Sequence, residues 1–129
     1  MIKYYKKGSD LKLNDYFGVK EMDCPCHNKE CVYTFLDGDH MDKLLLLRQM
    51  IKKPIIISSG YRCPKHNEEV GGARYSYHMT GCATDIYSLE VKKDALLMYI
   101  HNLDFKGVGT YKDKNVIHVD SRKGEKARW

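Results

Sequence analysis

The segment Ser76–Ile86 holds an imidazole and a carboxylate, His78 and Asp85, with the small residues Gly81 and Ala83 between them. A continuous helix would separate the two side chains by ~10 Å along its axis, too far for ligands of one metal ion. If the chain instead turns at Gly81 and continues as a short strand, Asp85 can point back toward His78. The segment therefore predicts two ligands of a metal ion, presented by a turn and a strand.

A third ligand is expected near the C-terminus, where Val116–Asp120 shows the alternation of a strand. His118 and Asp120 project to one side of that strand, with Asp120 about 6–7 Å further along. Two histidines, one aspartate and an open fourth position are the coordination pattern of a catalytic zinc rather than a structural one. We therefore predict one zinc ion on His78, Asp85 and His118. Asp120 would be either the general base or a partner that orients an imidazole.

These motifs resemble those of a known enzyme family. Ser76–Asp85 is similar to the Ser-x-His-x-x-Gly-x-Ala-x-Asp motif of the zinc D-Ala-D-Ala carboxypeptidases, and His118-Val119-Asp120 is similar to their later histidine motif. The resemblance continues in the same order through further segments: Ser59–Arg62, Pro64, Asn67, Val70–Ala73 and Ala127–Trp129. It implies the hedgehog/DD-peptidase fold and a peptidoglycan-peptide substrate, as in short phage or bacterial peptidoglycan peptidases.

The resemblance also implies roles for two residues outside the ligand set. Arg62 follows a turn at Gly60, where its guanidinium could bind a substrate carboxylate or stabilise an oxyanion. Ser76, two residues before His78, could support a ligand or the backbone through a hydrogen bond. Without the resemblance, either would be an ordinary surface or turn residue. The chain carries Asn115 where several relatives have an acidic residue, so the general base stays open.

The predicted chemistry is zinc-assisted amide hydrolysis, in which the ion lowers the pKa of water from about 15.7 toward 7 and polarises the scissile carbonyl. The sequence does not choose between a D-Ala-D-Ala carboxypeptidase and an endolysin-type endopeptidase. One alternative is a non-catalytic zinc domain of the same fold that acts in binding or assembly, which Asn115 favours. Another is a zinc-stabilised nucleic-acid-binding protein, but the basic and aromatic residues form no helical recognition stripe, so no nucleic-acid partner is expected.

Three thiols lie close together in the sequence at Cys24, Cys26 and Cys31, and the chain has five cysteines in all. With His27 or the distant Cys63 as a fourth ligand they could form a second, structural metal site. The single residue between the first two is a tighter spacing than usual for zinc. Reduced thiols in a turn and later-formed disulfides are the alternatives.

Length and composition predict one small domain. The 129 residues fit a single zinc peptidase domain of the α+β class, an antiparallel sheet packed with helices, in which residues 1–38 form an N-terminal extension. The net charge of +5 suits an anionic partner or an ordinary solvated surface. No stretch resembles a signal peptide or a membrane span. We expect a soluble monomer that is made in the cytoplasm and acts at the cell wall after release by another protein.

Periodicity and capping residues predict the other elements. A helix is expected after an N-cap at Asp39 and before Pro54, followed by a central strand at Ile55–Ser59 and a short helix over Lys65–Val70. Residues 8–22 are expected to form a loop.

A second long helix is expected over Leu89–Asn102, capped by Ser88, with an apolar stripe of Val91, Ala95, Met98 and Tyr99. A strand from Gly107 to Tyr111 should then turn at Lys112–Asn115 into the strand that carries His118, forming a hairpin.

Overall fold

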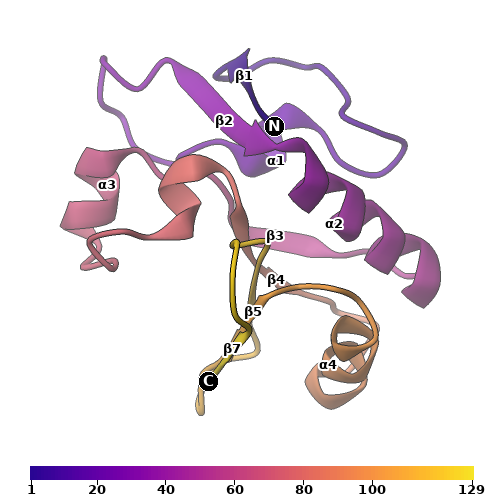
Figure 1. Cartoon of the computed structure of the whole chain (residues 1–129). Helices are drawn as coiled ribbons and strands as arrows, with labels where there is room; N and C mark the ends of the chain where they lie inside the picture. The colour runs from indigo at the N-terminus through magenta and orange to yellow at the C-terminus, as the bar shows by residue number, and fades with distance from the viewer.

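The computed structural model of the chain describes all residues, 1–129, as two sheets and a set of short helices (Figure 1). The larger sheet has the strand order β3-β4-β6-β5-β7, and β1 pairs with β2 in a separate sheet. Only the β5–β7 pair is parallel. The strands are β1 (Ile2–Lys6), β2 (Tyr33–Asp37), β3 (Ile56–Ser59), β4 (Ala83–Tyr87), β5 (Gly107–Thr110), β6 (Ile117–Asp120) and β7 (Ala127–Arg128).

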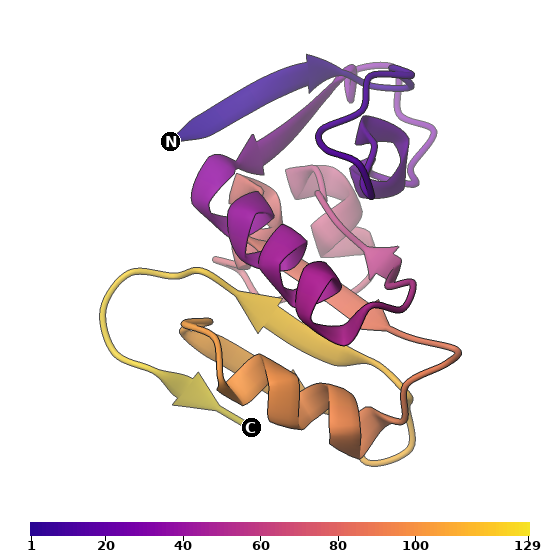
Figure 2. The ribbon, with the colours of Figure 1, turned by 90° about the vertical axis from the view of Figure 1, so that its right-hand side faces the viewer.

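The two longest helices cover one face of the larger sheet, as Figure 2 shows. The helices are α1 (Val19–Met22), α2 (Gly38–Ile51), α3 (Pro64–Glu69) and α4 (Lys93–His101), with a 3₁₀ turn η1 at Tyr77–Thr80. Leu44 and Leu47 of α2 and Leu96 and Ile100 of α4 are fully or almost fully buried in the core. The predicted α+β fold is therefore confirmed. No helix combines the length and the apolar character that crossing a membrane requires.

Alternation along β4 and β6 separates the core from the candidate ligands. Ile86, Ile117 and Val119 are buried in the core. Side chains at odd-numbered positions of β4 and even-numbered positions of β6 therefore point to the opposite face. In the antiparallel register of the two strands, Asp85 lies directly across from His118. The hairpin predicted for β5 and β6 is confirmed.

Two predicted details of the first long helix and the strand after it are wrong. The N-cap of α2 is Asp37, whose side chain accepts a hydrogen bond from the His40 N–H, and Asp39 lies in the first turn. A cap must precede the first helical residue, and the helix begins earlier than the apolar pattern indicates. The strand β3 is an edge strand that pairs only with β4, although its β-branched sequence is typical of a central strand.

The second long helix also differs from its prediction. Ser88 accepts hydrogen bonds from Glu90 and Val91 N–H groups in a turn, and α4 begins only at Lys93. The buried face of α4 contains Leu96 and Ile100 rather than the predicted stripe, from which Met98 is 70% exposed and Tyr99 39% exposed.

The first 38 residues contain more structure than the sequence indicated. The predicted loop at residues 8–22 includes α1, and the strands β1 and β2 were not anticipated. The backbone connects this region to the rest of the chain at two turns. The Asp37 N–H donates to the Gly81 carbonyl at 3.1 Å, and the Tyr61 N–H donates to the Met22 carbonyl at 2.8 Å. The turn at Gly81 precedes β4, and the turn at Tyr61 follows β3. The N-terminal region therefore packs against both turns.

Gly81 ends η1 with a left-handed backbone, φ +73°, and redirects the chain into β4. A Cβ atom at this position would lie 2.6 Å from the Leu36 Cα and closer still to the Phe35 carbonyl oxygen. Both the conformation and the space therefore require glycine, which explains the turn that the sequence predicted here.

We expect Gly81→Ala to reduce the free energy of unfolding well beyond the ~1–2 kcal/mol of left-handed strain alone, because β2 must also move. Gly71→Ala is the matched control, since Gly71 has φ +70° but open space around its Cβ position. Urea unfolding of both variants measures the difference. Equal losses in the two variants would contradict the role of the β2 contact.

Candidate metal centre

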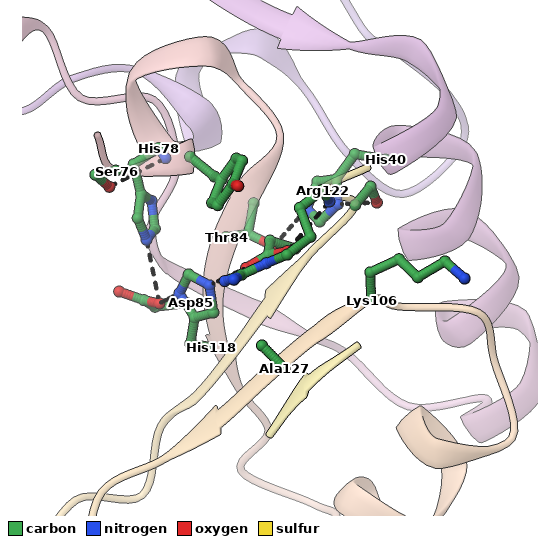
Figure 3. A network of polar contacts seen from close by, with 12 residues as sticks. His40, Ser76, His78, Thr84, Asp85, Lys106, His118, Arg122 and Ala127 are labelled. Atoms are coloured by element: carbon green, nitrogen blue, oxygen red, sulfur yellow. Dashed lines mark hydrogen bonds and ion pairs between the residues drawn. The ribbon is translucent and has the colours of Figure 1, made fainter. Parts of the chain in front are cut away.

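Three elements bring the predicted ligands together, His78 from η1, Asp85 from β4 and His118 from β6 (Figure 3). Their ligand atoms all lie within 4.8 Å of one another. The Asp85 Oδ1 atom is 3.0 Å from His118 Nδ1 and 3.3 Å from His78 Nε2. A tetrahedral site with bonds of ~2.0 Å has edges of ~3.3 Å between ligand atoms. The spacing of the three groups therefore fits a single ion.

The orientation of the His78 ring is set by its backbone surroundings. Ser76 caps η1 and accepts a hydrogen bond from the His78 N–H at 3.2 Å. The ring Nδ1 lies 2.8 Å from the Gly60 carbonyl oxygen, which can only accept a hydrogen bond, so Nδ1 carries the proton. The Nε2 atom is buried, faces Asp85 and has no hydrogen bond of suitable geometry. A buried lone pair of this kind fits a metal ligand.

The His118 ring is held from its other side by Asp120. His118 Nε2 lies 2.7 Å from Asp120 Oδ2, which leaves Nδ1 facing Asp85. The Arg122 guanidinium donates to both Asp120 oxygens at 2.7–2.8 Å, and the Arg122 backbone N–H donates to Oδ1. Asp120 itself is completely buried. Burial alone would raise the pKa of Asp120, but the bonds from Arg122 and His118 hold it well below its ordinary value.

The suggestion that Asp120 is the general base does not fit this geometry. Its oxygens are already bonded, it has no exposed surface, and the low pKa makes it a poor proton acceptor. The alternative role, orienting the imidazole of a ligand, matches the contacts. Gly107 makes the arrangement possible, because it lies opposite Asp120 in the register and a Cβ there would collide with the carboxylate.

The charge state of the cluster depends on the same contacts. Burial alone would raise the pKa of Asp85, but the neighbouring rings of His118 and His78 hold it well below its ordinary value. Burial would likewise lower the pKa of His118, but the carboxylates of Asp120 and Asp85 raise it. Two carboxylates on one imidazole thus form a strongly anionic environment, which favours a bound cation.

Arg62 lies next to this cluster, as the resemblance implied. One guanidinium nitrogen is 3.7 Å from Asp85 Oδ2 and another donates to Asn67 Oδ1 at 2.9 Å. The Arg62 backbone N–H donates to the His78 carbonyl at 3.1 Å. The side chain is therefore fixed beside the ligands with little exposure.

Two adjoining cavities open on the cluster, with volumes of about 480 and 560 Å³. Both are lined by Arg62, Gly71 and Tyr111, the first also by the two histidine ligands and the second by Asp85. Several lining residues had no role predicted from the sequence: His66, Tyr77, Tyr111, Arg122 and Trp129. Side chains alternate along a strand, so Arg122 is expected on the same side as His118 and Asp120. That pattern could have identified Arg122 from the sequence.

Aromatic rings enclose Arg122 beside the cluster. Its guanidinium carbon lies 4.6 Å from the Tyr77 ring and 5.5 Å from the Trp129 ring. The Trp129 ring also lies 5.1 Å from that of His118. These contacts position the C-terminal residue over the ligands, so it contributes to the cavity as well as to the sheet.

The three cysteines of the predicted second site also lie close together. Cys24, Cys26 and Cys31 group with Cys63, and their sulfur atoms lie within 4.8 Å of one another. His27, the other candidate for the fourth position, is exposed and outside the group.

Comparison with known proteins gives the family. The family model described as peptidase M15 matches residues 15–120. The chain belongs to the peptidase M15 family. The peptidoglycan L,D-endopeptidase MepK of Shigella flexneri is 29% identical over 93 residues, which cover 67% of this chain and 51% of the relative. The chain thus spans about half the length of this curated relative. The matched M15 region includes all three predicted ligands.

We expect Asp120→Asn to lower the zinc affinity of this site by ~10–100-fold, because the amide does not replace the charge that orients His118. The zinc ion in question is the one that His78→Ala removes. Competition with a chromophoric chelator measures the affinity. Asp94 is an exposed acid in the first turn of α4, so Asp94→Asn is the control and should leave the zinc affinity unchanged. An unaltered affinity in Asp120→Asn would show that Asp120 does not support the ligand.

Proposed function

We propose that the chain is a zinc-dependent peptidase that hydrolyses an amide bond in the peptide stems of peptidoglycan. The observation that carries the proposal is the cluster of His78, Asp85 and His118 at the junction of two cavities. Membership of the M15 family and the similarity to MepK, a peptidoglycan L,D-endopeptidase, support it. Such a substrate lies in the cell wall, where the enzyme would act.

A zinc ion held by these three residues would serve as a Lewis acid that acidifies water and polarises the scissile carbonyl. The chain's own residues prepare the site. Asp120 keeps the proton of His118 on Nε2, so Nδ1 stays free to bind the ion. Arg62 presents a guanidinium beside Asp85, where it can bind a carbonyl or carboxylate oxygen of the substrate.

Two lining residues remain for proton transfer and oxyanion stabilisation. Burial and the charge of Asp85 raise the pKa of Tyr111, which keeps its hydroxyl protonated and able to donate to an oxyanion. No carboxylate other than Asp85 lines either cavity. His66, half-buried in the wall that contains Asp85, is then the one lining imidazole outside the ligand set, and we assign proton acceptance to it.

The cavities favour an internal bond over the last bond of a peptide. One cavity is lined by the two histidine ligands and the other by Asp85, and both share Arg62 and Tyr111. A substrate chain that occupied both cavities would have residues before and after the scissile bond. A D-Ala-D-Ala carboxypeptidase needs space for only one residue after that bond. We therefore propose endopeptidase activity.

Purified muropeptides and liquid chromatography with mass spectrometry test this function. We expect internal cleavage by the wild type, loss of cleavage in His78→Ala, and wild-type activity in the exposed control Asp94→Asn. Release of D-Ala alone from pentapeptide stems would reassign the enzyme as a carboxypeptidase. A zinc-loaded protein that neither cleaves an internal bond nor releases D-Ala would support the non-catalytic alternative.

We expect His66→Gln to lower kcat by ~10²-fold or more, the usual contribution of a general base, without loss of zinc. Glu69→Gln is the control, because Glu69 lies 3.9 Å from the His66 ring but is outside both cavities. Wild-type kcat in His66→Gln would assign proton transfer elsewhere.

A further inference from the structure

A second group of metal-ligating side chains lies outside the candidate metal centre. Cys24, Cys26 and Cys31 come from the loop between α1 and β2, and Cys63 is the N-cap residue of α3. All four are free thiols whose sulfur atoms lie within 4.8 Å of one another. Thus segments far apart in the sequence contribute to one cluster of sulfur atoms.

The spacing of the sulfur atoms matches tetrahedral coordination. Cys63 Sγ lies 3.8 Å from Cys24 Sγ and 3.7 Å from Cys26 Sγ. Four sulfur ligands at ~2.3 Å from a central zinc ion would be ~3.8 Å apart, whereas a disulfide requires ~2.05 Å.

The surroundings of the cluster neutralise negative charge on sulfur. The Lys7 ammonium lies 3.5 Å from Cys26 Sγ and 3.6 Å from Cys31 Sγ, and it also donates to the Cys26 carbonyl at 2.9 Å. The Cys63 N–H donates to Cys24 Sγ at 3.5 Å, and the His66 N–H donates to Cys63 Sγ at 3.4 Å. Outer contacts of this kind stabilise thiolates and orient them toward an ion.

We propose that Cys24, Cys26, Cys31 and Cys63 bind a second zinc ion in a closed, structural site. Four sulfur ligands complete a tetrahedral shell, so this ion has no open position for a substrate. The site differs in chemistry from the N₂O set of the candidate metal centre, and it does not depend on the proposed peptidase activity.

The position of Cys63 gives this ion a structural consequence. Cys63 follows Arg62 and lies three residues after Gly60, whose carbonyl fixes the His78 ring. Between them, the Tyr61 N–H bonds to Met22, close to the start of the cysteine loop. The second ion would therefore join the N-terminal region to the segment that positions both Arg62 and His78.

Zinc content per chain, measured by mass spectrometry of the metal on protein purified without added metal, tests the proposal. We expect two zinc ions in the wild type and one in His78→Ala. We also expect one in Cys26→Ser and two in Cys82→Ser. Cys82 is the matched control because it is the one cysteine outside the cluster.

Cobalt substitution provides a test that does not require a cysteine variant to fold. His78→Ala loaded with cobalt should retain the strong thiolate-to-cobalt charge-transfer absorption of a sulfur-ligated ion. A single zinc in the wild type that His78→Ala removes would overturn the proposal. An intact mass lower by the four hydrogens of two disulfides would overturn it as well. Failure of the muropeptide assay would leave these readouts unchanged, so the two proposals can fail separately.

Discussion

The cross-strand pair of Asp85 and His118 is the constraint on which the candidate metal centre depends. The two residues meet because β4 and β6 pair in one register, and a slip of one residue would turn either side chain into the core. Ile86, Ile117 and Val119 hold this register by packing beneath the helices, where all three are buried. Burying the apolar face of the sheet therefore fixes the chemistry of its other face.

A buried polar network connects the helical layer to the metal centre. His40 of α2 lies 3.0 Å from the hydroxyl of Thr84, which is on β4 next to Asp85 (Figure 3). It also lies 2.7 Å from the hydroxyl of Ser121, which directly follows β6. Burial lowers the pKa of His40 to about 3, so the ring stays neutral and bonds both hydroxyls without an unpaired charge in the core. The network provides hydrogen-bond partners for His40, Thr84 and Ser121 beneath the site. It does not include Asp120, whose carboxylate bonds the His118 ring.

The sequence predicted that the three candidate ligands come together, because their spacing follows local rules. The glycine turn before β4 and the alternation of β6 are short-range signals, and they place His78, Asp85 and His118 on three predictable elements. The role of Asp120 depended on Arg122 and on the space left by Gly107, which are tertiary contacts. Likewise, the sequence allowed either His27 or Cys63 beside the other cysteines. Only the fold brings Cys63 to them, from 32 residues beyond Cys31. The first 38 residues lacked clear periodicity, because their strands and helix are short and are stabilised by contacts with the turns around the metal centre.

The most direct test of the metal centre is anomalous X-ray diffraction recorded on both sides of the zinc absorption edge. The geometry predicts a zinc peak bonded to His78 Nε2, Asp85 and His118 Nδ1, with the Asp120 carboxylate still bonded to His118 Nε2. A zinc ion bound to His118 through Nε2, or the absence of a peak among the three side chains, would contradict the account.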